Sequence, residues 1–169
     1  MIVADTSAWV EFLRATGSPA HLRLRELIAG EGDLATTDVV VMELLAGTTT
    51  HDAMTQLRRL LLRFRHLPVE GLADHEAAAD LYRRCRAGGE TVRKLTDCLI
   101  AVVAVRNGAT LLHRDQDFEV IARHTPPAVG ELAAVAVPGL DGADGRGPER
   151  VMDHHLSGSL TAGPSRRRS

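Results

Sequence analysis

Aromatic residues and lysine are scarce in this chain. Only 3% of its 169 residues are Phe, Trp or Tyr, which argues against a platform on which RNA bases stack. Lys94 is the only lysine, so nearly all positive charge is arginine. The net charge of −2 gives no overall attraction to nucleic acid, and contact with a charged ligand has to come from a local group of side chains.

Metal-binding cysteine motifs, a leader peptide and long apolar runs are also missing. Cys85 and Cys98 stand apart and lack Cys/His spacing, so we expect buried free thiols in a reducing compartment, with no zinc site or disulfide framework. The N-terminus MIVADTSAWV lacks the basic stretch of a signal peptide, and the longest apolar run, 98–105, is too short to cross a bilayer. These absences predict a soluble, cytoplasmic protein with no membrane contact.

Short apolar runs alternate with amphipathic segments along most of the chain. The sequence predicts strands at 2–4, 33–36, 66–69 and 109–113. It predicts helices at 8–13, 20–28, 39–46, 52–65, 73–87, 97–106 and 118–124. Residues suited to capping precede three of these helices: Thr6 or Ser7, Asp38 and Thr96.

This alternation predicts an α/β fold in three layers, α/β/α, around a central parallel sheet. In such folds ligands bind beyond the carboxyl ends of the strands. We expect one domain over residues 1–137. From Pro138 onward the Gly-, Pro- and Arg-rich composition cannot build a core, so residues 138–169 are expected to form a disordered tail.

Four acidic residues stand where this topology brings strand ends together. Asp5 and Asp115 each end a strand. Asp97 opens the apolar helix before the last strand, and Glu43 lies on the helix after the second strand. Carboxylates held together repel unless a cation lies among them, and no Lys or Arg is evidently paired with these acids, so the set predicts a divalent metal site. Singly, each Asp could equally be a helix cap, and Glu43 a paired core carboxylate.

The chain resembles a PIN domain, and within that group a VapC-type toxin ribonuclease, over residues 1 to about 128. The matching motifs, in order, are DTS at Asp5, MELLAG around Glu43, TDCLIAVVA around Asp97 and HRDQDF with Asp115. The resemblance implies a metal-dependent endoribonuclease of a type II toxin–antitoxin (VapBC) system. It also implies a homodimer, an RNA substrate and a cognate VapB-type antitoxin that neutralises the enzyme.

By position, the resemblance implies a catalytic quartet of Asp5, Glu43, Asp97 and Asp115. The expected metal ligands are Asp5, Asp97 and Asp115. Asp117 is expected to help or replace Asp115, and Thr6 or Ser7 to hydrogen-bond a ligand carboxylate or a metal-bound water. Mg²⁺ is the expected cofactor, with Mn²⁺ able to substitute, because hard oxygen ligands hold it while leaving a water free to attack the phosphodiester.

Arginines gather in the middle third of the chain, between the proposed acids. A basic flank around an acidic centre suits a phosphodiester held by its backbone, although a solvated helix face gives the same pattern. The candidates for contact with the RNA backbone are Arg93, Lys94 and Arg114.

Two other classes of protein remain open from the sequence. One is a catalytically silent PIN-like binding module, against which the intact acidic quartet speaks. The other is a phosphoaspartyl enzyme or receiver-like α/β domain, which also places an Asp at the end of its first strand. The opening DTS lacks the second acid of a DxD motif, which argues against a phosphatase of that kind.

Overall fold

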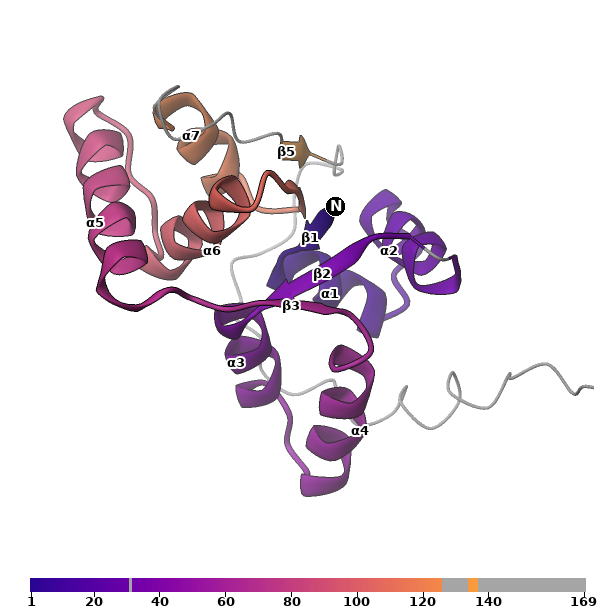
Figure 1. Ribbon diagram of the computed structural model, residues 1–169. Coiled ribbons are helices and arrows are strands. Elements are labelled where there is room, and N and C mark those ends of the chain that lie inside the picture. The colour runs from indigo at the N-terminus through magenta and orange to yellow at the C-terminus, as the bar shows by residue number, and fades with distance from the viewer. Residues whose placement is uncertain (31, 126–133, 137–169) are drawn as a thin grey trace, which may run out of the picture.

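The computed structural model describes residues 1–30, 32–125 and 134–136, and it has the expected alternation of strands and helices (Figure 1). The strands are β1 (Ile2–Ala4), β2 (Leu34–Thr37), β3 (Arg65–Leu67), β4 (Thr110–His113) and β5 (Ala134–Ala136). The helices are α1 (Thr6–Leu13), α2 (Pro19–Ala29), α3 (Asp38–Ala46), α4 (His51–Leu61), α5 (Gly71–Ala87), α6 (Leu95–Arg106) and α7 (Asp117–His124).

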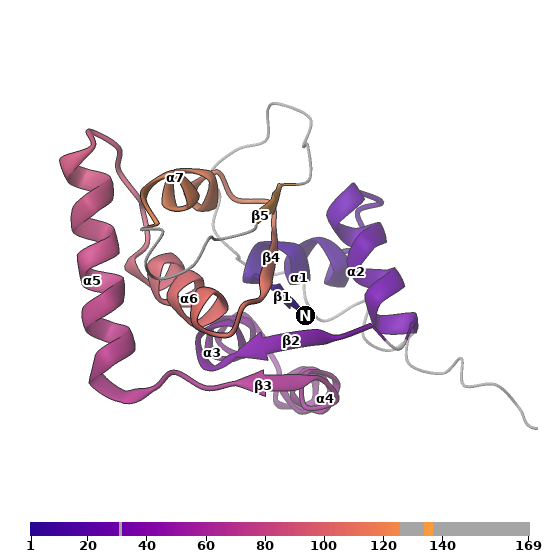
Figure 2. The same ribbon diagram turned by 45° about the horizontal axis from the view of Figure 1, so that its top comes forward.

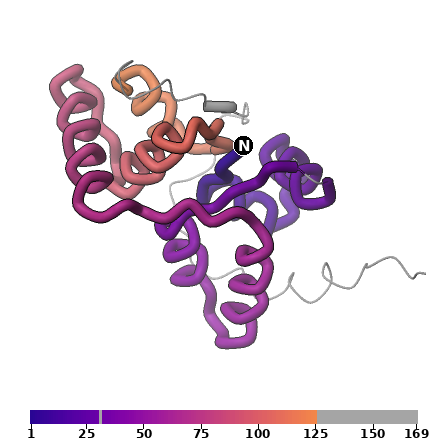
Figure 3. Tube along the Cα trace, in the orientation of Figure 1, coloured from indigo at the N-terminus to yellow at the C-terminus, as the bar shows by residue number. Residues whose placement is uncertain are grey.

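The strands form one parallel sheet in the order β3-β2-β1-β4-β5. The chain starts at its centre, where Val3 pairs with Ala35 of β2 on one side and Leu111 of β4 on the other (Figure 3). Figure 2 shows α5, α6 and α7 gathered on one face of the sheet and α1 and α2 on the other. The predicted parallel α/β architecture is therefore confirmed. Its register brings the ends of β1 and β4 side by side.

Helix α6 is the most buried helix of the fold. Its residues Ile100–Val105 are all buried, and Phe118 of α7 and Trp9 of α1 are fully buried in the same core. A helix that is apolar on every side has to lie inside the domain, so its first turn, with Asp97, is also held in the interior. Cys98 in that turn is a buried free thiol, as predicted.

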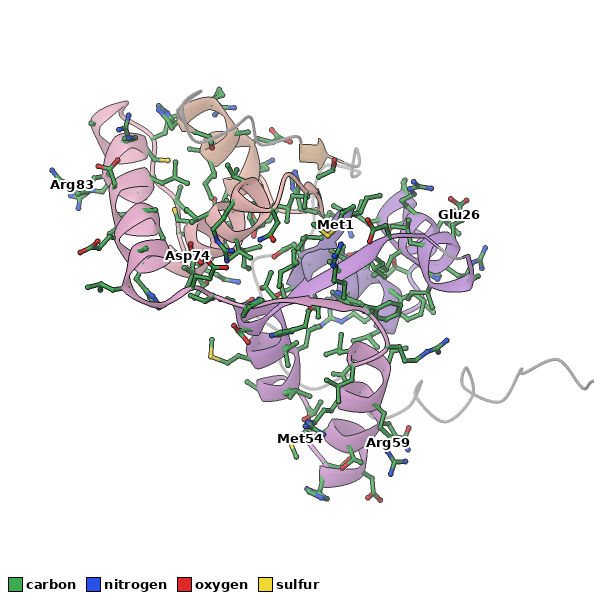
Figure 4. All side chains as sticks on the ribbon, in the orientation of Figure 1. Met1, Glu26, Met54, Arg59, Asp74 and Arg83 are labelled. Atoms are coloured by element: carbon green, nitrogen blue, oxygen red, sulfur yellow. The ribbon has the colours of Figure 1, made fainter. Side chains whose placement is uncertain are left out.

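An ion pair with a buried carboxylate fastens α6 to α5. The carboxylate of Asp74, on α5, accepts hydrogen bonds from Nε and Nη2 of Arg106 at 3.1 and 3.0 Å. It also accepts one from the backbone N–H of Glu70 at 2.7 Å, so its charge is fully partnered. Figure 4 shows Asp74 directed inward from α5, whereas Arg83 of the same helix points to solvent.

Three predicted caps are wrong, because the polar groups near these helix starts have other partners. Asp5, and not Thr6 or Ser7, caps α1. Thr37 caps α3, while Asp38 instead accepts from the backbone N–H of Val69 at 2.7 Å. Lys94 occupies the cap position of α6 without a side-chain hydrogen bond, and the hydroxyl of Thr96 donates to Glu43 instead.

Several element boundaries also differ from the prediction. Helix α4 ends at Leu61 rather than at 65, because β3 begins at Arg65 and residues 62–64 form the turn between them. Strand β5 was not predicted; it has only three residues and pairs with β4. The predicted disordered tail, 138–169, lies outside the described residues. Among the helices described here, none is both long and apolar enough to cross a membrane.

Candidate functional site

Three carboxylates converge beside the end of β4. They belong to Asp97 in the first turn of α6, Asp115 in the turn after β4, and Asp117 at the start of α7. One oxygen of each lies within 4.8 Å of an oxygen of the others. Asp97 and Asp117 are buried and Asp115 is half-buried. Three acids held this closely can share a cation, and we call them the carboxylate cluster.

Asp5 lies at the end of β1 and is not one of the three acids within 4.8 Å of one another, but its charge acts on Asp97. Its carboxylate is buried and accepts hydrogen bonds from the backbone N–H and the hydroxyl of Ser7, at 2.8 and 2.6 Å. Burial raises the pKa of Asp5 to about 6, although the hydrogen bonds from Ser7 act to lower it. Ser7 was expected to hydrogen-bond a carboxylate of the site, and in the structure it donates to the carboxylate of Asp5.

Asp97 is the least satisfied acid of the site. Its side chain is buried, and Oδ2 has no hydrogen-bond partner among the described residues. Burial, followed by the negative charges of Asp5 and Asp115, raises the pKa of Asp97 to about 8, while the charge of Lys94 acts to lower it. A buried carboxylate without a partner is costly, and a cation placed among these acids would remove that cost.

Glu43 is held between two helices by threonine hydroxyls. Thr6 of α1 donates to Oε2 at 2.5 Å, and Thr96 of α6 donates to Oε1 at 3.0 Å. Both oxygens therefore have a partner, and Glu43 links α3 to the starts of α1 and α6. Thr6 was expected to support an acid of the site, but Thr96 was missed because a Thr before an apolar run looks like a helix cap.

Asp115 and Asp117 share the side chain of Arg93. Nη2 of Arg93 donates to Oδ1 of Asp115 at 2.5 Å, and Nε lies 3.2 Å from both oxygens of Asp117. The backbone N–H of Arg93 also donates to Oδ2 of Asp117 at 2.8 Å. The negative charge of Asp115 and the hydrogen bond with Asp117 raise the pKa of Arg93. The expectation that no cation is paired with Asp115 is therefore wrong: its partner lies 22 residues earlier in the chain.

The other two basic candidates are placed differently. Arg114 forms an ion pair with Glu11, a buried residue of α1, and its backbone N–H donates to the hydroxyl of Ser7 at 2.9 Å. Lys94 is exposed, and its ammonium group forms no hydrogen bond or ion pair with the described residues, but its charge acts on Asp97. Of these side chains, only the guanidinium of Arg93 contacts the carboxylate cluster.

Comparison with known proteins agrees with this fold. Residues 2–124 match the PIN domain. Ribonuclease VapC11 of Mycobacterium tuberculosis is 48% identical over 126 residues, which cover 74% of this chain and 94% of that protein. Ribonuclease VapC32 of the same organism is 31% identical over 132 residues, which cover 78% of this chain and 98% of that protein.

Solved structures show the same architecture. VapBC2 from Rickettsia felis, bound to a DNA fragment from its promoter, matches with a TM-score of 0.60 at 18% identity, covering 80% of this chain and 98% of that chain. A likeness at this identity concerns the fold, and the fold excludes the receiver-like alternative. With the PIN match and the two ribonucleases, it shows that this chain belongs to the PIN-domain family, among the VapC ribonucleases.

Proposed function

We propose that this chain is the toxin of a toxin–antitoxin pair and that it cuts RNA with a divalent metal ion held by Asp5, Asp97 and Asp115. The observation that carries the proposal is Asp97. Its buried Oδ2 lacks a partner among the described residues, and burial, followed by the charges of nearby acids, raises its pKa to about 8. An acid in this position is destabilising for the folded protein unless a cation binds there.

The donor set fits Mg²⁺ or Mn²⁺. It consists of hard carboxylate oxygens and includes no thiolate or imidazole. Oxygens of Asp97 and Asp115 lie within 4.8 Å of each other, and the charge of Asp5 acts on Asp97. When bound there, such an ion supplies an activated water and charge stabilisation for phosphodiester hydrolysis. Because Asp97 is the buried member without a partner, we assign it as the principal ligand. Mg²⁺ is the physiological choice that we expect.

Asp115, rather than Asp117, is the outer ligand in this proposal. Both oxygens of Asp117 are engaged by Arg93, and its side chain is only 8% exposed. Asp115 is 21% exposed and uses Oδ1 alone for its hydrogen bonds with Arg93 and the backbone N–H of Asp117. Its second oxygen is therefore the one left for a cation.

Glu43 and Ser7 prepare the site. The two threonine hydroxyls keep Glu43 in one position and leave its charge facing the acids, because the charge of Glu43 acts on both Asp5 and Asp97. Ser7 fixes the carboxylate of Asp5 with two hydrogen bonds. With these supports, the ligands do not need to reorganise before the reaction, which is how a rigid site lowers the barrier.

The partner in this proposal is a VapB-type antitoxin. The structural relatives include a toxin–antitoxin complex from Klebsiella pneumoniae, with a TM-score of 0.59 at 17% identity, which supports a paired mode of action by fold alone. We also expect a homodimer acting in the cytoplasm. Size-exclusion chromatography with light scattering tests for the homodimer with the chain alone and for the toxin–antitoxin complex with the cognate VapB-type antitoxin added.

Cleavage of RNA by the purified chain tests the proposal. Protein freed of antitoxin is incubated with total RNA and with Mg²⁺, Mn²⁺ or a chelator, and the new ends are mapped by sequencing. The variant Asp97→Asn removes the buried ligand, and Asp80→Asn is the matched control because Asp80 is an exposed acid of α5 paired with Arg84.

The expected result is cleavage that needs the metal, disappears in Asp97→Asn and persists in Asp80→Asn. Cleavage that survives in Asp97→Asn at the wild-type rate contradicts the assignment. Absence of cleavage in wild-type protein, together with firm binding of an antitoxin, favours the catalytically silent binding module.

A further inference from the structure

Arg93 is exposed although its partners are not. Its side chain is 66% exposed, whereas those of Asp115 and Asp117 are 21% and 8% exposed. The guanidinium therefore lies on the outer edge of the carboxylate cluster, with one side against the acids and the other open to solvent. A guanidinium used only as an internal partner for acids would gain from being buried with them.

The hydrogen bonds of Arg93 leave donors free. A guanidinium has five N–H groups in a planar fork. Nε serves Asp117 and Nη2 serves Asp115, while Nη1 has no acceptor among the described residues. Arg93 can thus keep both carboxylates and still present an edge of two nitrogens to another oxygen-rich group. Phosphate is the group that this geometry suits best.

The main chain leading into Arg93 is held in place. Its backbone N–H donates to Asp117, and the preceding Val92 is buried. Earlier in the same connection, Glu90 pairs with Arg123 and with His124 of α7, the latter at 2.7 Å. The connection between α5 and α6 is therefore held against α7, which limits where the guanidinium can go.

We propose that Arg93 binds a phosphate of the RNA backbone at the edge of the site, and that Asp117 is the positioning residue that aims it. This inference rests on the proposed function. The acids of the site repel a phosphodiester, and one divalent ion does not cancel their charge, so a cation beside the cluster is needed for the substrate to approach. Arg93 is the cation already held there.

The alternatives among the basic residues fit this task less well. Arg114 is committed to the buried carboxylate of Glu11, and withdrawing it would leave that acid without its cation. The ammonium of Lys94 has no partner in the described part of the chain that would orient it, so it contributes charge without a defined direction. We therefore expect Lys94→Gln to weaken RNA binding less than Arg93→Gln does.

RNA binding tests the proposal separately from cleavage. The probe is a fluorescently labelled single-stranded RNA of mixed sequence, measured by anisotropy in Ca²⁺ over a range of salt concentrations, with a gel to show that the RNA stays intact. Arg93→Gln should raise the Kd about tenfold and reduce the slope of log affinity against log salt by about 0.7, the value for one lost contact with single-stranded nucleic acid. The matched control Arg84→Gln, which removes another exposed, paired arginine, on α5, should change the Kd less than about twofold.

Asp117→Asn gives the sharper result. Removing a negative charge beside a phosphate should tighten RNA binding if Asp117 is only one more acid. A positioning role predicts the opposite: a Kd raised about threefold or more and a smaller salt slope, because Arg93 is no longer aimed. Asp80→Asn is its control and should leave the Kd unchanged. Arg93→Lys covers the case in which Asp117→Asn does not fold, since Lys keeps the charge but lacks the fork, and it too should bind RNA more weakly than wild type.

The two proposals fail in different ways. If the wild-type chain cuts RNA with metal but Arg93→Gln keeps the wild-type Kd and salt slope, the role of Arg93 is wrong and the proposed function stands. If Asp117→Asn binds RNA more tightly than wild type, the positioning role of Asp117 is wrong. If the wild-type chain neither cuts RNA with metal nor binds the probe, both proposals are wrong. Mn²⁺ affinity, measured by calorimetry, should not fall in Arg93→Gln, because the lost charge is positive. A clear fall would show instead that Arg93 serves mainly to hold the carboxylates of Asp115 and Asp117 in place for the metal.

Discussion

Asp74 and Asp97 look alike in the sequence and are buried to the same degree, but the protein treats them differently. Each stands in the first turn of a helix, and they are 4% and 3% exposed. Asp74 is partnered on both oxygens by Arg106 and by a backbone N–H. Asp97 has an oxygen without a partner among the described residues and lies among further acids. Partners, not burial, distinguish a structural acid from a candidate for catalysis.

The largest expected effect is on cleavage by Asp97→Asn. If Asp97 is the principal metal ligand, the rate should fall by roughly a hundredfold to a thousandfold, the scale seen when one charge-stabilising group leaves a catalytic site. Initial rates on a defined RNA, at saturating Mn²⁺, provide the measurement. A fall smaller than that of Asp80→Asn would place the chemistry elsewhere.

Asp74→Asn should have the reverse effect, on stability and not on the reaction. Removing the charge of the buried Asp74 leaves Arg106 with Glu70 as its remaining counter-charge, and it should lower the free energy of unfolding by about 2 kcal/mol. Urea denaturation measures the loss. The activity of the protein that remains folded should match wild type. Strong inactivation without loss of stability would erase the distinction between the two aspartates.

The same comparison predicts an unusual dependence of stability on pH. Folding raises the pKa of Asp5 from 3.8 to about 6 and the pKa of Asp97 from 3.8 to about 8. Between pH 3.8 and about 8 the folded chain therefore binds more protons at these two groups than the unfolded chain does. Stability without metal should therefore be greatest below pH 4 as far as these two groups are concerned, and fall as the pH rises toward 8.

In Asp97→Asn this decline should largely vanish, and its Tm at pH 8 without metal should exceed that of wild type by about 4 °C or more. Differential scanning fluorimetry in chelator, from pH 5 to pH 8.5, measures the curves. Adding Mn²⁺ should stabilise wild type most at high pH. A wild-type Tm that climbs with pH in chelator would show that Asp97 is ionised and satisfied without metal.

The smallest expected effect comes from Thr96→Val, which keeps the side-chain shape and removes one hydrogen bond to Glu43. We expect a loss of about 1 kcal/mol in stability and a roughly tenfold fall in cleavage, as for residues that hold a catalytic group in place. Thr48→Val is a suitable control, since its hydroxyl donates to the backbone of Leu45. An unchanged cleavage rate would mean that Thr6 alone positions Glu43.

Much of the architecture could be predicted because apolar runs and their breaks report burial directly. The runs at β1, β4 and α6 specify a buried parallel sheet and a central helix, and the acids follow at the strand ends where such sheets bind ligands. Strand β5 was missed, since it depends on pairing with the edge of β4, which no local pattern in its sequence displays.

The hydrogen-bond partners of the acids could not be predicted from the sequence. Arg93 meets Asp117 across 24 residues and Thr96 meets Glu43 across 53, and no local pattern links positions so far apart. The cap predictions failed for a related reason, because Thr, Ser and Asp beside a helix start serve equally well as caps and as supports for a catalytic carboxylate. Only the tertiary contacts decide which role each residue takes.

Calorimetric titration of Mn²⁺ into the metal-free chain is the most direct test of the account, with Asp97→Asn and Asp80→Asn titrated beside it at the same pH. We predict saturable binding in wild type and in Asp80→Asn, and its loss in Asp97→Asn. Binding of equal affinity in all three proteins, or no binding in wild type, would contradict the claim that the buried, unpartnered Asp97 is the centre of a metal-dependent nuclease site.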